Sequence, residues 1–126
     1  MDKKVIATEK APKAIGPYSQ GMQFGNLVFT SGQLPINPHN DELIVDIEAA
    51  TKQSLENVKA ILESAGSSME SVIKTVVFLK DMNDFPKMNA VYQTFFQNNE
   101  PARSAVQIAK LPKDAVVEIE AIACVK

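Results

Sequence analysis

The 126-residue chain has one cysteine, one histidine and no tryptophan. Because Cys124 is the one cysteine, no disulfide can form within the chain. A reducing compartment is therefore the default expectation. Zinc sites need clustered Cys and His ligands, so Cys124 and His39 predict none. Ser-His-Asp and Cys-His schemes likewise lack a second suitable partner. We expect His39 to be an exposed loop residue and Cys124 to be a buried small apolar residue on a strand.

An excess of positive charge and long apolar runs are absent as well. Thirteen Lys and Arg stand against fifteen Asp and Glu, a formal net charge of −2, which disfavours nucleic acid as a partner. No apolar run approaches a membrane span, and no long apolar region follows the basic N-terminal residues as in a secretory signal. Five glycines include no phosphate-binding spacing. We therefore expect one cytoplasmic domain, residues 1–126, with no membrane association.

Two segments have the apolar period of a helix. The first begins at Ile47, with Asp46 as N-cap and Gly66 as the residue after the C-cap. The second opens at Asn83 or Asp84, with Pro86 tolerated in its first turn. Its apolar stripe is read as core packing; the stripe consists of Phe85, Met88, Val91, Tyr92, Phe95 and Phe96.

Four other segments have the composition of strands: 26–31, 72–79, 103–108 and 117–125. Segment 72–79 is apolar at both parities, which predicts a central strand covered on both faces. The order of elements predicts an α+β fold in which two helices pack on one face of a mixed sheet.

Arg103 and two glutamates are the candidates for chemistry. Arg103 lies at a loop-to-strand junction after Pro101, where a guanidinium could bind a carboxylate through two hydrogen bonds; a solvated surface arginine is the alternative. Glu118 and Glu120 alternate with apolar residues, so both project from the face opposite those residues. The pattern does not choose between these two acids, and an outer sheet face often carries acids without a function.

Several motifs, spread in order over the whole chain, resemble the RidA family, also called the YjgF family. They are Ala14-Ile15-Gly16-Pro17-Tyr18-Ser19-Gln20-Gly21, Thr30-Ser31-Gly32-Gln33, Gln53-Ser54-Leu55-Glu56-Asn57-Val58-Lys59-Ala60, Pro101-Ala102-Arg103-Ser104-Ala105-Val106, Leu111-Pro112-Lys113-Asp114 and Val117-Glu118-Ile119-Glu120-Ala121.

The resemblance implies a chorismate-mutase-like (YjgF-like) fold and a homotrimer with ligand clefts between subunits. It implies hydrolysis of 2-imino acids, such as 2-iminobutanoate and 2-iminopropanoate, to 2-oxo acids and ammonia, with no metal and no cofactor. By position, Arg103 would hold the substrate carboxylate and Glu118 would position the attacking water. Tyr18 would line the cleft as a third catalytic residue. The further substrate-binding residues implied by the resemblance are Ser31, Gly32, Asn89 and Ala105.

The chain departs from many relatives in two places. Ala105 stands where a cysteine is frequent, so no thiol there can be a required nucleophile, and the pocket shape beside Ala105 changes. The segment 97–100 is shorter than in many relatives, which could alter one rim of the cleft. Two other functions use the same framework: a non-catalytic trimeric sensor of small 2-oxo acids, and an RNA-acting inhibitor of translation, which the net charge of −2 disfavours.

Overall fold

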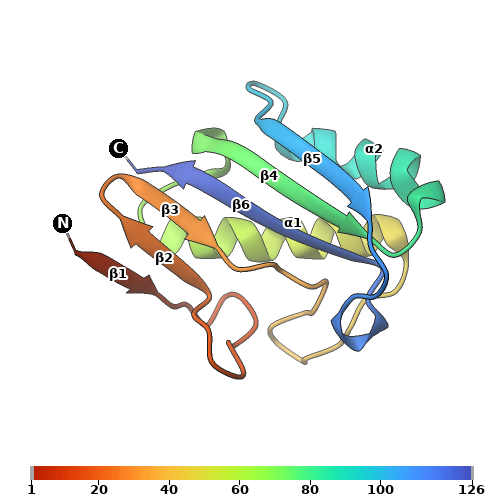
Figure 1. Cartoon of the computed structure of the whole chain (residues 1–126), viewed down its shortest axis with the longest axis horizontal. Coiled ribbons are helices and arrows are strands. Elements are labelled where there is room, and N and C mark those ends of the chain that lie inside the picture. Colours follow the sequence, from red (N-terminus) through yellow and green to blue (C-terminus); the bar gives the residue numbers. More distant parts are fainter. Residues whose placement is uncertain (1, 126) are drawn as a thin grey trace.

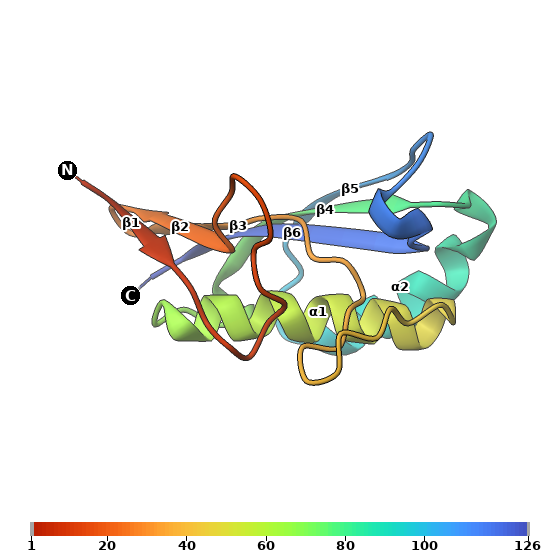
Figure 2. The same cartoon turned by 90° about the horizontal axis from the view of Figure 1, so that it is seen from below.

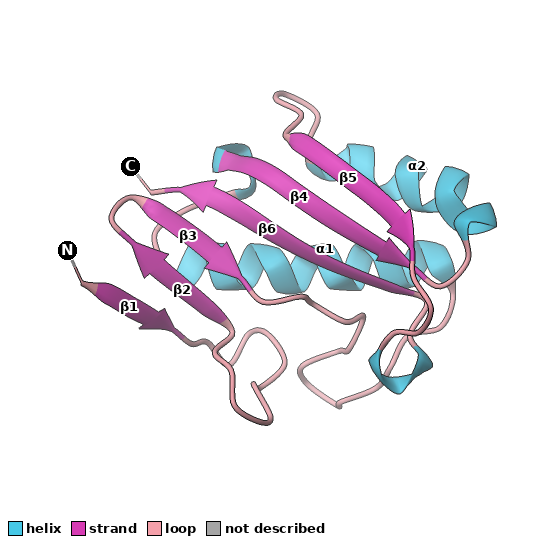
Figure 3. Ribbon diagram, viewed as in Figure 1, coloured by secondary structure: helices cyan, strands magenta, loops and turns pink. Residues whose placement is uncertain are grey.

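The computed structural model describes residues 2–125 as one six-stranded sheet with two α-helices (Figures 1 and 3). The strands are β1 (Lys3–Ile6), β2 (Gly21–Phe24), β3 (Leu27–Thr30), β4 (Val72–Leu79), β5 (Ala102–Gln107) and β6 (Val117–Cys124). The helices are α1 (Ile47–Ser64) and α2 (Phe85–Phe95). Short 3₁₀ turns, Met69–Ser71, Met82–Asp84 and Pro112–Asp114, precede β4, α2 and β6.

The sheet has the order β1-β2-β3-β6-β4-β5. All neighbouring strands are antiparallel except β4 and β5, which are parallel and are joined through α2. The C-terminal strand β6 therefore lies between β3 and β4, and β5 is an edge strand (Figure 1). This mixed sheet confirms the predicted fold class.

Local sequence signals set the ends of α1. Asp46 is extended, and its Oδ2 accepts a hydrogen bond of 3.0 Å from the amide of Ala49, as an N-cap does. The helix ends at Ala65, and Gly66 follows with φ +79°, a conformation that glycine adopts without a Cβ clash. Both predicted caps of this helix are confirmed.

The second helix also begins as predicted. Asp84 precedes α2, and Pro86 lies in the first turn, where a missing amide hydrogen breaks no helical hydrogen bond. Met88 and Tyr92 of its apolar stripe are buried, and so is Phe96 just past its end. Phe85, Val91 and Phe95 are only partly buried, so the stripe is core at its centre and surface at its margins.

Both helices pack on the same face of the sheet (Figure 2). The core fills the space between these layers. Its fully buried large side chains come from α1, from α2 and from the inward parity of the central strands; they include Leu55, Val58, Leu62, Leu79, Met88, Val117 and Ile119. Among residues 2–125 no α-helix lies on the other face of the sheet.

Three details differ from the sequence-based expectations. Cys124 is half-buried rather than buried, because its strand parity places it on the uncovered face with Ile122. Strand β4 is central and has two neighbours, but Ile73 is 47% exposed, so only its helix-facing side is covered within the described chain. Strands β1 and β2 were not predicted, because four-residue strands with mixed polarity carry little periodic signal.

Neither α1 nor α2, nor any other helix between residues 2 and 125, combines the length and apolar composition that crossing a membrane requires.

Candidate active site

Arg103 is held by side chains of α2. It lies on the edge strand β5, and its Nη1 donates a hydrogen bond of 2.7 Å to Oδ1 of Asn89. The guanidinium carbon lies 4.7 Å from the ring centroid of Tyr92 and 5.3 Å from that of Phe85. A cation over two aromatic faces is attracted by the ring quadrupoles. The exposed guanidinium is therefore oriented, with further N–H groups free to bind an anion.

Tyr92 is itself held in place by a residue of the sheet. Its hydroxyl forms a buried hydrogen bond of 2.6 Å with the hydroxyl of Thr75 on β4. Burial raises the pKa of Tyr92 above its usual value, and this effect outweighs the hydrogen bond with Thr75 and the positive charge of Arg103, which both lower it. The ring is thus neutral at physiological pH, and it serves as a rigid platform for Arg103.

Glu118 is held against backbone instead. It projects from β6 on the uncovered face of the sheet, and Gly32 lies directly against its carboxylate. A Cβ added to Gly32 would lie 2.6 Å from Oε2 of Glu118. Two backbone hydrogen bonds between Gln33 and Ile119, of 2.8 and 3.2 Å, fix the loop beside the strand. The sequence Ser31-Gly32-Gln33 therefore sets the position of the acid.

A cavity of about 610 Å³ opens beside this carboxylate. Its walls come from the N-terminal loop, from the loop after β3 and from the turn before β6; they are lined by Pro12, Lys13, Ile15, Tyr18, Gln20, Ser31, Gly32, Gln33, Leu34, Ile36, Pro112, Lys113 and Glu118. Tyr18 is 52% exposed at this cavity. The Ser31 hydroxyl donates a 2.6 Å hydrogen bond to the carbonyl of Ser19, which ties two of the walls together.

The environment of Glu118 favours its protonated form more than water does. Partial burial is the main cause of its raised pKa, and the negative charge of Glu120 raises it further. A carboxylate whose pKa is raised is a stronger base than an ordinary surface carboxylate. The cavity distinguishes the two acids, which the strand pattern alone could not do, because Glu118 lines it and Glu120 is not among its lining residues.

Within one chain, Arg103 and Glu118 lie on opposite faces of the sheet. Arg103 pairs with Thr75 of β4, whereas Glu118 pairs with Phe78, three residues further along the same strand. An odd separation along a strand reverses the face. Their Cα atoms are roughly 14 Å apart by strand geometry. The single chain therefore does not bring the predicted cation and the predicted acid together.

The other predicted residues divide between these two places. Tyr18, Ser31 and Gly32 line the Glu118 cavity. Asn89 accepts the hydrogen bond from Arg103. Ala105 shares the parity of Arg103 and packs partly buried against the core. The set thus forms an acid half and a cation half.

Two buried carboxamides hold the loops of the acid half. Gln20 accepts from the amide of Thr8 and donates to three carbonyls of the N-terminal loop, those of Thr8, Ala11 and Pro12. Asn57 of α1 donates to the carbonyls of Leu34 and Ile36, at 3.1 and 2.9 Å. Each amide replaces the backbone pairing that an irregular loop lacks.

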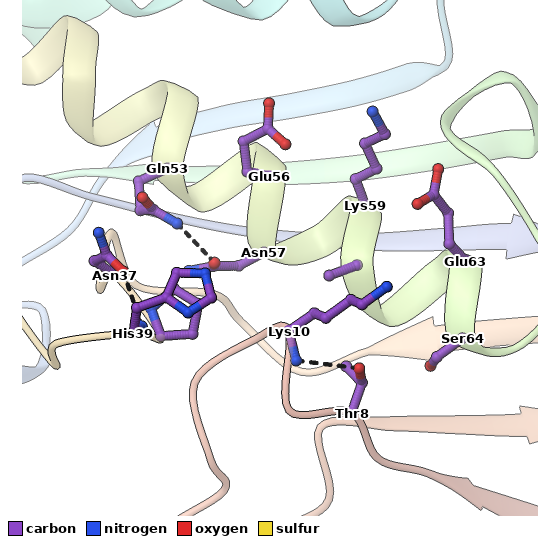
Figure 4. A pocket seen from close by; sticks show the side chains of 12 residues that line it. Thr8, Lys10, Asn37, His39, Gln53, Glu56, Asn57, Lys59, Glu63 and Ser64 are labelled. Carbon is purple, nitrogen blue, oxygen red and sulfur yellow. Dashed lines mark hydrogen bonds between the residues drawn. The ribbon is translucent and has the colours of Figure 1, made fainter.

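Asn57 also accepts a hydrogen bond from the side chain of Gln53, one turn earlier on α1. Figure 4 shows this pair among the residues that line a polar groove beside α1. His39 stands at the rim of this groove and is exposed, as predicted. Among residues 2–125 no group of three or more His, Cys, Asp or Glu side chains could hold a metal ion.

Sequence reasoning missed part of each half. Phe85 and Tyr92 were read only as core, although their spacing with Asn89 puts all three on one stripe of α2 facing the edge strand. Lys13 and Lys113, which line the Glu118 cavity, were not singled out. Surface lysines give no periodic signal, and loop positions become meaningful only when the walls are assembled.

Comparison with known proteins shows the family to which the chain belongs. The model of the family described as "Endoribonuclease L-PSP" matches residues 8–125. The chain is 54% identical over 123 residues to the 2-iminobutanoate/2-iminopropanoate deaminase of Escherichia coli, covering 95% of this chain and 96% of that one. It is 55% identical over 124 residues to a RutC family protein of Pyrococcus abyssi, covering 98% of both.

Solved structures match the fold closely. The crystal structure of E. coli TdcF with bound serine superposes with a TM-score of 0.95 at 51% identity, covering 98% of this chain and 99% of that one. The structure of the YjgF gene product of E. coli gives a TM-score of 0.94 at 54% identity, with 98% and 99% coverage. The relatives and structures named here cover 95–98% of the chain.

Proposed function

We propose, because this chain belongs to the RidA (YjgF) family whose model is described as "Endoribonuclease L-PSP", that it is an imine deaminase. It hydrolyses 2-imino acids such as 2-iminobutanoate and 2-iminopropanoate to 2-oxo acids and ammonia. The 54% identity to deaminases bearing that name is the similarity that supports the reaction. The observation that carries the mechanism is an oriented guanidinium together with a cavity whose acid has a raised pKa.

The chemistry needs anchoring, a placed water and proton transfer. Arg103 binds the substrate carboxylate through guanidinium N–H groups that Asn89 leaves free. Ionised Glu118 accepts a proton from the water that attacks C2, and a proton is returned to the departing ammonia. The electrophilic carbon is part of the substrate itself, and it becomes more reactive when the imine nitrogen is protonated. Binding and positioning therefore account for most of what the protein supplies.

The site we propose is shared between two copies of the chain in a homotrimer. The opposite faces of Arg103 and Glu118 support this, since one copy cannot place both groups on one small substrate. The uncovered sheet face, on which Phe29 is 40% exposed and Ile73 47% exposed, offers apolar area for such packing. Arg103 and Asn89 of one copy then face the Glu118 cavity of the next.

Complementation between inactive variants tests both the reaction and the shared site. Arg103→Ala is expected to lower kcat/KM for freshly generated 2-iminopropanoate about a hundredfold, since it removes two charge-assisted hydrogen bonds. Arg103→Lys is also expected to be poor, because an ammonium does not reproduce the planar fork. Glu118→Gln is expected to lower kcat at least about a hundredfold, with Glu120→Gln as the matched control.

Co-expression of Arg103→Ala with Glu118→Gln, purified through two different tags, is then expected to restore activity at about a third of the sites, which is one cleft in each mixed trimer. Recovery occurs because a mixed trimer contains a cleft with an intact arginine from one copy and an intact glutamate from the other. Absence of recovery in a mixed oligomer would contradict the shared site, whereas a wild type that does not accelerate ammonia release would contradict the deaminase function.

A non-catalytic sensor of 2-oxo acids would use the same arginine. Calorimetry with 2-oxobutanoate beside the imine assay separates the two functions, because a sensor binds the acid without accelerating ammonia release. RNA cleavage, which the family description suggests, is less favoured by the net charge of −2. Tight RNA binding that persists at high salt would favour it instead.

A further inference from the structure

The turn between β5 and β6 contains two consecutive left-handed residues that are not glycine. Lys113 has φ 58° and Asp114 has φ 56°. Left-handed backbone is costly for a residue with a Cβ; aspartate tolerates it better than lysine does. Leu111 and Ala115, which flank the turn, are buried at 2% and 1% exposure and fix its two ends. The chain therefore maintains a strained lysine in a turn that glycine or asparagine would form more easily.

Asp114 has a structural partner that explains its position. Its Oδ2 lies 2.9 Å from Nζ of Lys80, and the backbone amide of Lys80 donates to the carbonyl of Val116. This ion pair lowers the pKa of Asp114 and keeps it charged. Lys113 has no comparable role: across residues 2–125 its ammonium forms no ion pair with an acid. The strained backbone of Lys113 is therefore not explained by an ion pair of its side chain. Backbone strain of this kind at the wall of a cavity points to a function.

Lys113 instead lines the cavity that holds Glu118. This part of the protein is electrostatically unfavourable for an anionic substrate, because Glu118 and the neighbouring Glu120 both carry carboxyl groups on the same face. A 2-imino acid must bring its own carboxylate toward these acids. Lys113 and Lys13 are lysines among the residues that line this cavity, and positive charge at its wall attracts an anionic substrate.

We propose that Lys113 is a substrate-recruiting cation, held at the cavity wall by a strained left-handed turn. The inference rests on the proposed function, and it deepens that function by assigning a second positive group beside Arg103. Arg103 anchors the carboxylate in the bound state. Lys113 instead raises the rate at which anionic substrates enter the cavity and lowers the rate at which they leave it. Its loss therefore raises KM and leaves kcat unchanged.

Lys113→Gly tests this proposal, because it is expected to keep or raise stability while it weakens substrate binding. Glycine relieves the left-handed strain, so the melting temperature is expected at or slightly above that of the wild type. The KM for 2-iminopropanoate is expected to rise about fivefold at low salt, and this difference is expected to shrink at high salt. Lys113→Arg is expected to keep the wild-type KM. Lys110→Ala, which removes a charge from the same connection outside the cavity lining, is the matched control.

An unchanged KM in Lys113→Gly would overturn the proposal, and so would an equal rise in Lys110→Ala, since that would indicate a general charge effect. Calorimetric binding of 2-oxobutanoate to the same variants gives a readout independent of turnover. If the wild type does not hydrolyse imines, the deaminase function fails, but the affinities for 2-oxobutanoate still decide whether Lys113 recruits anions.

Discussion

The cation half and the acid half of the candidate site are held in place by different means. Arg103 lies over two aromatic rings and donates to an amide, all contributed by side chains of α2. Glu118 lies against the bare backbone of Gly32, in a loop that is tied to β6 by main-chain hydrogen bonds. The cation half therefore depends on the chemistry of particular side chains, whereas the acid half depends on the lack of a side chain at Gly32.

This difference has a consequence for substitutions. A side-chain platform can be weakened gradually, because each ring or amide contributes part of the orientation. A carboxylate that lies directly against glycine backbone must move when one methyl group is added there, so the smallest possible substitution is expected to have a large effect on catalysis. Glu118 is also the more weakly solvated of the two groups, as its raised pKa shows, so its ionisation is open to perturbation by its surroundings.

Among the substitutions that test how the two halves are held in place, the largest expected effect is that of Gly32→Ala. The added methyl group meets the end of a flexible side chain, so the Glu118 carboxylate moves while the fold is kept. A displacement of this size is expected to lower kcat about a hundredfold with a melting temperature close to that of the wild type.

Gly21→Ala is the matched control for that substitution, because its Cβ would lie 2.8 Å from Cγ2 of buried Ile61. We expect Gly21→Ala to lower the melting temperature and to spare kcat. If Gly32→Ala kept full turnover, the close approach would not be what positions the acid.

An intermediate effect is expected from Tyr92→Phe, which tests the cation half. Loss of the hydroxyl leaves the buried Thr75 hydroxyl without its partner, at a cost of about 1–3 kcal/mol in the free energy of unfolding. The ring remains beneath Arg103, so KM is expected to change little. Urea denaturation measures the cost, and the double variant Tyr92→Phe/Thr75→Val is expected to recover part of it. Equal destabilisation in the double variant would contradict the pairing.

The smallest expected effect concerns the pH dependence of stability. Because the pKa of Glu118 is raised in the folded state, the folded state binds a proton more tightly than the unfolded state. The corresponding stability is present in acid and is lost as pH rises through the raised pKa. Glu118→Gln stays neutral, so its unfolding free energy relative to the wild type is expected to increase between about pH 4 and about pH 7.

Glu120→Gln removes the neighbouring charge, which contributes to the raised pKa of Glu118, and it is expected to show a weaker trend of the same sign. Urea titrations of both variants at the two pH values provide the measurement. A constant difference between Glu118→Gln and the wild type would mean that the pKa of Glu118 is not raised by folding.

The helices and the longer strands could be predicted because their signals are local. Asp46 and Gly66 delimit α1 through hydrogen bonds and dihedral angles within a few residues of each end. The alternation along β6 placed Glu118 and Glu120 on the face opposite the core. The strands β1 and β2 escaped prediction because their pairing, rather than their composition, makes them strands.

The sequence by itself determined which residue types this protein can use: an arginine, glutamates and no metal-binding cluster, carried on motifs that identify the family. Only the tertiary structure decided which acid lines a cavity, that Arg103 rests on Tyr92, and that Arg103 and Glu118 face opposite sides of the sheet. Side-chain parity is a property of one strand, whereas register is set between strands distant in the chain. The placement of the two halves therefore follows from pairing through β4, which no local pattern encodes.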